Sequence, residues 1–227
     1  MTIPSLVHSK IKTVIFDLDG TLIESAPSIL IGLEFAIKKS GLFPTLPLDS
    51  SLVGPPLKDI LDKIVGGQLN VDLDILMADF KSYYDADGFK ESKPYPGVRD
   101  MVNQLTESNI SLYLATNKRL KPTLKIIDYF GWASLFDGVY AIDKFPEAPF
   151  SNKASMIRAL IQAESIEKAH AVYVGDRNED FEASAANGID AILVNWGYCD
   201  FQKNPATDDA KYADSPGELY RMIVGRQ

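Results

Sequence analysis

Lys12-Thr-Val-Ile-Phe16 leads directly into Asp17-Leu-Asp19-Gly-Thr21. The first five residues form a short run rich in β-branched and apolar side chains, which is typical of a parallel strand buried on both faces. Gly20 permits a sharp turn that can aim backbone N–H groups inward. The stretch therefore predicts a buried strand that delivers two carboxylates, Asp17 and Asp19, at its carboxyl end.

Further apolar runs resemble this strand, and helical patterns alternate with them. The runs that predict strands are Ser111–Ala115, Gly138–Ala141, Ala171–Val174 and Ala191–Val194. The patterns that predict helices are Gly97–Ser108, Pro122–Phe130, Asn152–Ala163 and Asp180–Asn187. Alternation of this kind predicts an α/β fold, a doubly wound and mostly parallel sheet with helices on both faces.

One long segment, residues 24–93, breaks the alternation. A helix is expected to begin at Ser25, which would cap it with Pro27 in the first turn, and two more are expected at Leu57–Val65 and Leu73–Tyr84. Lys93–Gly97 is the expected return linker. The sequence therefore predicts an all-helical insert at 24–93 within a core made of residues 1–23 and 94–227.

Polar side chains follow three of the predicted strands. Besides Asp17 and Asp19, these are Thr116-Asn117-Lys118 and the run from Gly175-Asp176 to Asp180. Ligands of open α/β sheets bind outside the carboxyl ends of the strands, so we expect these residues to converge. Asp17 and Asp176 would repel each other unless a cation joined them, and an oxygen-rich set favours Mg²⁺.

Each of these residues, taken alone, has a simpler interpretation. A single aspartate is usually a solvated loop residue or a helix cap, Thr116 could cap a helix, and Lys153 could be a surface lysine. The combination is more informative, because independent motifs fall on the predicted strand ends. The pattern as a whole therefore favours a functional site.

Composition limits the classes of function. The chain has 227 residues, and 23 basic against 31 acidic side chains give a net charge of −8, which argues against a nucleic-acid binder. Its one cysteine excludes an internal disulfide framework and fits a cytoplasmic setting. No secretory signal and no membrane-spanning run is seen, so no membrane partner is expected. The oligomeric state stays open.

These motifs resemble those of the haloacid dehalogenase-like hydrolase superfamily. The run from Phe16 to Leu22 matches its first motif, Thr116 the second, Lys153 in Ser-Asn-Lys-Ala-Ser the third, and Gly175–Asp180 the fourth. The order is that of the family, and the resemblance covers nearly the whole chain. It implies a Rossmann-like core, with the helical insert as a cap of the C1 type.

Within the superfamily the chain looks most like the phosphoglycolate phosphatase-like branch. Glu24–Pro27, Val53–Leu57, Thr116–Lys118 and Trp196–Tyr198 carry that similarity. Ser151–Ala154 departs from the Lys-Pro-x-Pro that the branch often has at the third motif, and is similar to members described as 5′-nucleotidase-like. The resemblance implies a small phosphorylated metabolite as substrate.

The resemblance also implies roles for individual residues. Asp17 would be the nucleophile that forms an aspartyl-phosphate, and Asp19 the general acid and base. Mg²⁺ would bind the Asp17 carboxylate, the Asp19 carbonyl and Asp176. Asp180 would hold metal-bound water or Lys153 instead of binding the metal directly. Contacts to the phosphoryl group or the rest of the substrate are implied for Thr116, Lys153, Asn117, Lys58 and Arg119.

Three alternatives remain at this point. A dehalogenase of the same superfamily is disfavoured by the second aspartate and the acidic fourth motif. A phosphomutase would use the same aspartates, but would return the phosphoryl group to a sugar. A phospho-accepting signalling module, from a different class, would have no obvious use for Asp19 or for an insert of this size.

Overall fold

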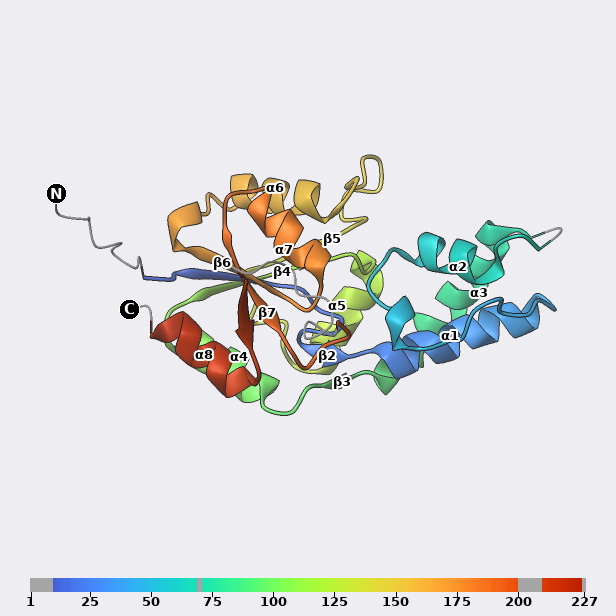
Figure 1. Cartoon of the computed structure of the whole chain (residues 1–227), viewed down its shortest axis with the longest axis horizontal. Coiled ribbons are helices and arrows are strands. Elements are labelled where there is room, and N and C mark those ends of the chain that lie inside the picture. Colours follow the sequence, from blue (N-terminus) through green and yellow to red (C-terminus); the bar gives the residue numbers. More distant parts are fainter. Residues whose placement is uncertain (1–9, 69–70, 200–209, 226–227) are drawn as a thin grey trace.

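The computed structural model of the chain describes residues 10–68, 71–199 and 210–225. The described part holds a six-stranded sheet in the order β5-β4-β1-β6-β7-β8, and every neighbouring pair of strands is parallel (Figure 1). Its strands are β1 (Thr13–Phe16), β4 (Ser111–Thr116), β5 (Gly138–Ala141), β6 (Ala171–Gly175), β7 (Asp190–Val194) and β8 (Lys211–Ala213). The predicted α/β fold class is confirmed.

Helices cover both faces of this sheet. Successive side chains of a strand point to opposite faces, so each strand buries residues under the helices on both sides. Val14 and Phe16 of β1 belong to one buried cluster, and Ile15 between them belongs to another. The first cluster includes side chains of α4 (Val98–Glu107), α5 (Leu120–Tyr129) and α8 (Pro216–Val224). The second includes side chains of α6 (Lys153–Ala163) and α7 (Asn178–Ala185).

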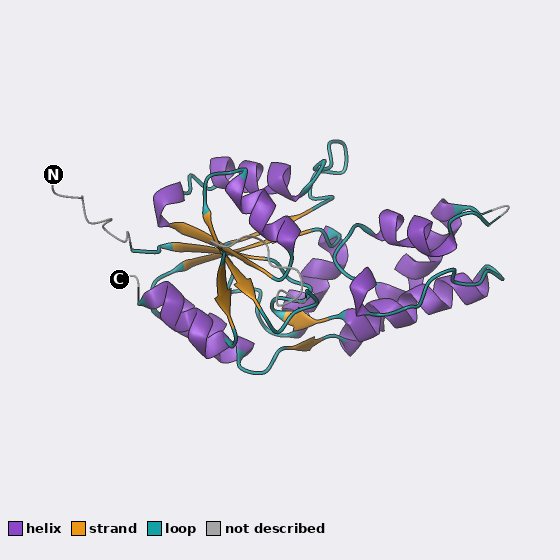
Figure 2. Cartoon of the chain, in the orientation of Figure 1, coloured by secondary structure: helices purple, strands orange, loops and turns teal. Residues whose placement is uncertain are grey.

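The segment from residue 25 to residue 92 is helical and lies at one end of the molecule (Figures 1 and 2). It contains α1 (Ala26–Lys39), α2 (Leu57–Val65) and α3 (Leu73–Tyr84), with short 3-10 turns η1 (Ser50–Leu52) and η2 (Gly88–Glu91). The helices α1 and α3 pack closely: a Cβ at Gly32 would lie 2.9 Å from the ring of Phe80. Glycine at this position therefore lets the two helices approach.

Two short strands join this segment to the sheet domain. They are β2 (Ile23–Glu24) and β3 (Lys93–Pro94), and they pair antiparallel. The pairing holds the two connections side by side, so the insert enters and leaves the core at one place (Figure 2).

The sequence patterns missed some elements. The strands β2, β3 and β8 are two or three residues long, too short for a periodic signal. The helix α8 did carry a start signal: the Ser215 hydroxyl accepts a hydrogen bond from the Glu218 amide, with Pro216 between them. The helix α7 begins at Asn178, two residues before the predicted start, and Gly188 beyond its end has a positive φ.

Within the described residues, no helix combines the length and the apolar character that crossing a membrane requires.

Candidate active site

Three adjacent strands of the sheet end at one place. Asp17 follows β1, Thr116 is the last residue of β4, and Asp176 follows β6. Because β4 and β6 flank β1 in parallel register, the three carboxyl ends lie together. All three side chains are buried. As predicted, the structure brings these three side chains together at one edge of the sheet.

Lys153 connects two of the aspartates. Its Nζ lies 3.2 Å from Asp17 Oδ2 and 2.5 Å from Asp180 Oδ1, and its side chain is 3% exposed. Asn152 caps the helix that starts with this lysine by accepting a hydrogen bond from the Ser155 amide, which fixes the first turn of α6. Lys153, which could be a surface lysine when its position in the sequence is considered alone, is therefore a buried cation in this structure.

Asp180 has both oxygens engaged. Besides the bond from Lys153, its Oδ2 accepts hydrogen bonds from the backbone amides of Asp176 and Arg177, at 3.1 and 2.9 Å. Its carboxylate thus closes the turn between β6 and α7 and holds the buried lysine at the same time. The arrangement suits a supporting residue more than a direct ligand.

Two glycines make room for Asp176. Gly20 has φ +85°, and a Cβ there would lie 2.3 Å from Asp176 Oδ2. A Cβ at Gly197 would lie 2.3 Å from the Asp176 Cβ. The Tyr198 amide donates to Asp176 Oδ2 at 2.8 Å. The loop after β7 is therefore part of the site, whereas the sequence analysis used Trp196-Gly197-Tyr198 only as a mark of similarity to a family branch.

The acidic cluster fits a divalent cation. Carboxylate oxygens of Asp17, Asp176 and Asp180 lie within 4.8 Å of one another, and the cluster holds neither cysteine nor histidine. The buried Asp17 Oδ1 has no hydrogen-bond partner within the described part of the chain. Hard oxygen donors and an oxygen free to coordinate match Mg²⁺.

Burial governs the acidity of this cluster. Loss of hydration raises the pKa of Asp17 to about 8; Lys153 opposes the rise, and the neighbouring carboxylates add to it. Burial, together with Asp180, likewise raises the pKa of Asp176 to about 7. Both shifts reflect negative charge that lacks compensation, which a bound cation would provide.

Asp19 has a partner, Lys118, which the sequence analysis placed at a strand end without assigning it a role. Both its oxygens lie 2.9 Å from Lys118 Nζ. The lysine also lies 4.9 Å from the centre of the Tyr84 ring, which comes from α3. Burial lowers the pKa of Lys118, but Asp19 and Tyr84 more than offset this, so the pKa is raised and the lysine stays charged.

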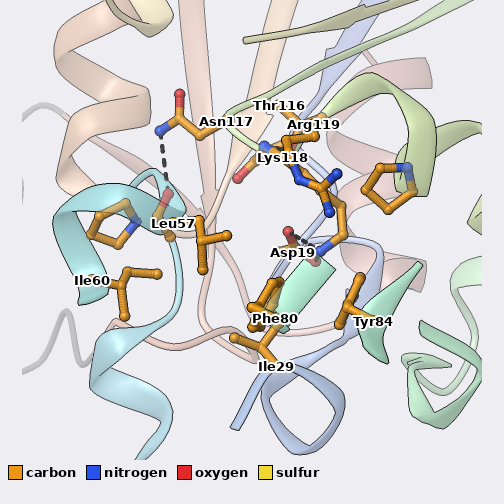
Figure 3. Close-up of a pocket in the computed structure, with 14 residues that line it drawn as sticks. Asp19, Ile29, Leu57, Ile60, Phe80, Tyr84, Thr116, Asn117, Lys118 and Arg119 are labelled. Atoms are coloured by element: carbon orange, nitrogen blue, oxygen red, sulfur yellow. Dashed lines mark hydrogen bonds and ion pairs between the residues drawn. The ribbon is translucent and has the colours of Figure 1, made fainter. Parts of the chain in front are cut away.

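A pocket lies next to the two carboxylates that follow β1, and both Asp17 and Asp19 line it. Figure 3 shows Asp19 among the lining residues. Thr116, Asn117 and Arg119 also line the pocket. The Asn117 amide donates to the Gly54 carbonyl at 3.3 Å, a contact between the strand end and the insert that Figure 3 marks. The remaining lining residues are Ile29, Gly54, Pro55, Leu57, Ile60, Phe80, Tyr84, Lys118 and Pro122.

The two cations expected to contact substrate differ in position. Arg119 lines the pocket, where it forms a two-point ion pair with Asp85. Lys58 is exposed and is absent from the lining, although its neighbour Leu57 belongs to it. Lys58 lies in the first turn of α2, and its side chain leaves the helix on the solvent side.

The start of α1 is held by the core rather than by its own first residues. Ser25 occupies the capping position, but its side chain makes no capping bond, contrary to the expectation from sequence. Instead the Tyr198 hydroxyl accepts hydrogen bonds from the backbone amides of Ser25 and Ala26, at 2.7 and 2.8 Å. Tyr198 thus contacts Asp176 through its backbone amide and the start of α1 through its hydroxyl.

Tyr198→Phe should therefore destabilise the protein. The change leaves two buried amides without an acceptor, which should lower the free energy of unfolding by about 1–3 kcal/mol. Urea denaturation measures the change. Tyr129→Phe, at a tyrosine that is 54% exposed, is the matched control and should change the value by less than about 0.5 kcal/mol. Equal stability of the two variants would contradict the capping role.

Comparisons with known proteins agree with this geometry. The family described as "Haloacid dehalogenase-like hydrolase" matches residues 14–194. The chain is 30% identical to tyrosine-protein kinase PtkA of Mycobacterium tuberculosis over 215 residues, 93% of this chain and 72% of that protein. It is 29% identical to phosphoglycolate phosphatase of Aquifex aeolicus over 188 residues, 82% of this chain and 86% of that one.

A solved structure shares the fold at full length. A predicted phosphatase from Clostridium acetobutylicum superposes with a TM-score of 0.83 at 26% identity, covering 96% of this chain and 100% of that one. The sequence motifs, the sheet order and these matches agree. The chain therefore belongs to the haloacid dehalogenase-like hydrolases and, within them, to the branch that resembles phosphoglycolate phosphatases.

Proposed function

We propose that the chain is a Mg²⁺-dependent phosphatase that hydrolyses a small phosphomonoester through an aspartyl-phosphate on Asp17. One observation carries the proposal. Asp17 lines the pocket and belongs to a carboxylate cluster with Asp176; its Oδ2 lies 3.2 Å from Lys153 Nζ, and its Oδ1 has no hydrogen-bond partner within the described residues. A carboxylate nucleophile needs this setting: a cation to hold it and a free face toward substrate.

The first half of the reaction transfers the phosphoryl group. An Asp17 oxygen forms a bond to phosphorus while the bond from phosphorus to the leaving oxygen breaks. Asp19 gives its proton to that oxygen, so an alcohol departs. Lys153 and Thr116 stabilise the charge on the phosphoryl oxygens as the transition state forms.

The second half releases phosphate. Asp19, now ionised, takes a proton from a water molecule as the water oxygen bonds to phosphorus. The bond from phosphorus to Asp17 breaks, which restores the carboxylate and yields inorganic phosphate. Lys118 Nζ, which lies 2.9 Å from both Asp19 oxygens, holds this carboxylate in position.

The metal-binding residues in this proposal are Asp17, Asp176 and the backbone carbonyl of Asp19, with Asp180 supporting Lys153. When bound, Mg²⁺ supplies positive charge that offsets the repulsion between the carboxylate and an anionic substrate. Asp180 contributes by fixing the backbone amide of Asp176 and the position of the lysine.

We also propose that residues 24–93 act as a cap over the site. The antiparallel strands β2 and β3 form its connection to the core, and α1, α2 and α3 supply one side of the pocket. Closure would exclude bulk water during transfer of the phosphoryl group.

A phosphate-release assay tests the function. With Mg²⁺, acetyl phosphate and a panel of phosphomonoesters should yield inorganic phosphate, and excess chelator should reduce the rate by at least about 10³-fold. Adding Mg²⁺ back should restore the rate. Activity that survives chelation would contradict the metal requirement, and a phosphorylated isomer in place of free phosphate would indicate a phosphomutase.

A further inference from the structure

We infer that the pocket selects a phosphomonoester whose leaving group is uncharged and largely apolar. This inference rests on the proposed phosphatase function and names the class of its substrate. The leaving group of a bound substrate would lie against the lining residues that the insert contributes, since Asp17 lines the pocket from the end of β1.

The part of the lining that the insert contributes is apolar. The insert contributes Ile29 from α1, Leu57 and Ile60 from α2, and Phe80 and Tyr84 from α3 (Figure 3). The Tyr84 hydroxyl lies within 3.4 Å of the Ser28 hydroxyl, which donates to it. These five side chains lie in the insert, whereas Asp17 and Asp19 follow the end of β1, so the apolar residues line the pocket beyond the carboxylates.

The two cations that line the pocket are both paired already. Lys118 is held by both oxygens of Asp19. Arg119 is held by Asp85, with Nη1 lying 3.0 Å from Oδ2 and Nη2 bonded to Oδ1. The Asp85 side chain is 11% exposed, so solvent screens this pair only weakly. Among the described lining residues, no cation is left to receive a second anionic group of the substrate.

This charge pattern separates two kinds of leaving group. A carboxylate would have to displace Asp19 or Asp85 from its partner, or lose its hydration against apolar side chains without compensation. An apolar group would instead gain from burial against the same side chains. The pocket thus disfavours the first kind and favours the second.

Two matched substrates test the inference. Ethyl phosphate and 2-phenylethyl phosphate have leaving alkoxides of similar basicity, so the ratio of their kcat/KM values reports contacts of the side group. We expect 2-phenylethyl phosphate to be preferred by at least about tenfold, since burying several apolar carbons contributes this much. Phosphoglycolate, with its carboxylate, should fall below ethyl phosphate.

Variants locate the effect in the pocket. Leu57→Ser should reduce the preference for 2-phenylethyl phosphate about threefold or more, because it removes apolar contact area. Leu57→Met, which keeps the area, should preserve the preference. Asp62→Ala, at an exposed position of the same helix, is the matched control and should leave it unchanged. Asp85→Asn frees Arg119 and should raise kcat/KM for phosphoglycolate about fivefold or more.

The outcomes are distinguishable. A wild-type protein that turns over phosphoglycolate as well as or better than 2-phenylethyl phosphate would overturn the inference, whatever the variants do. Acetyl phosphate tests the chemistry separately, because its leaving group is small and reactive. If acetyl phosphate is not hydrolysed, the proposed function fails. Calorimetry in the presence of Mg²⁺ then tests the substrate preference by binding alone. The inference requires a Kd for 2-phenylethyl phosphate that is about tenfold below the Kd for phosphoglycolate.

Discussion

Asp17→Asn should abolish phosphate release, lowering kcat by roughly 10⁴-fold or more. An amide oxygen is a poor nucleophile, and no other described side chain in the pocket is placed beside both Lys153 and Asp176. The fold should survive the change. Burial raises the pKa of Asp17 to about 8, so the folded chain already disfavours its charge, and a neutral amide of the same shape removes that cost.

Single-turnover kinetics and circular dichroism together check this result. The variant should show native spectra and no phosphate release with Mg²⁺ present. Asp62→Ala, at an exposed aspartate that does not line the pocket, should retain wild-type rates. Turnover by Asp17→Asn above about one per cent of wild type would rule out Asp17 as the nucleophile.

Asp19→Asn should lower kcat by about 10²–10⁴-fold, the usual contribution of a general acid–base group. The structure adds an expected effect on stability, because Lys118 Nζ lies 2.9 Å from both Asp19 oxygens. The asparagine keeps one acceptor for the lysine but loses the counter-charge, so a modest fall in stability should accompany the loss of activity.

The choice of substrate separates the two steps that Asp19 serves. Acetyl phosphate has a leaving group that needs little protonation, so Asp19→Asn should still be phosphorylated by it. Breakdown should be slow because no base activates water, and the phosphorylated protein should accumulate to near one equivalent by mass spectrometry. Rapid turnover with no accumulation would show that another group acts as the base.

Much of this site could be predicted because short sequence patterns are enough to place its residues. A buried apolar run specifies a strand, and the residues directly after it lie at the carboxyl edge of a parallel sheet. Asp17, Thr116 and Asp176 each follow or end such a run, so their convergence needed only the strand order. Lys153 was harder, since a lysine at a helix start is usually exposed; the motif, rather than periodicity, indicated it.

Contacts between distant segments were not predictable. Lys118 and Asp19 are 99 residues apart; the strand ends predict that they lie near each other, but not that they form an ion pair. Arg119 and Asp85 are 34 residues apart, and no local pattern connects them. Lys58 shows the converse: a cation in the expected segment is exposed, because the side chain of Leu57 takes the pocket side of α2. Which side of a short helix faces the pocket depends on how it packs.

Local sequence patterns specify the α/β class, the alternation of strands and helices, and the carboxylates at the strand ends. These follow from hydrophobic runs and turn residues, which act within a few positions of the chain. Packing across the fold sets which charges are neutralised and which face of the insert lines the pocket. Ion pairing and burial depend on distances across the fold, and those are set only when the insert packs over the sheet edge.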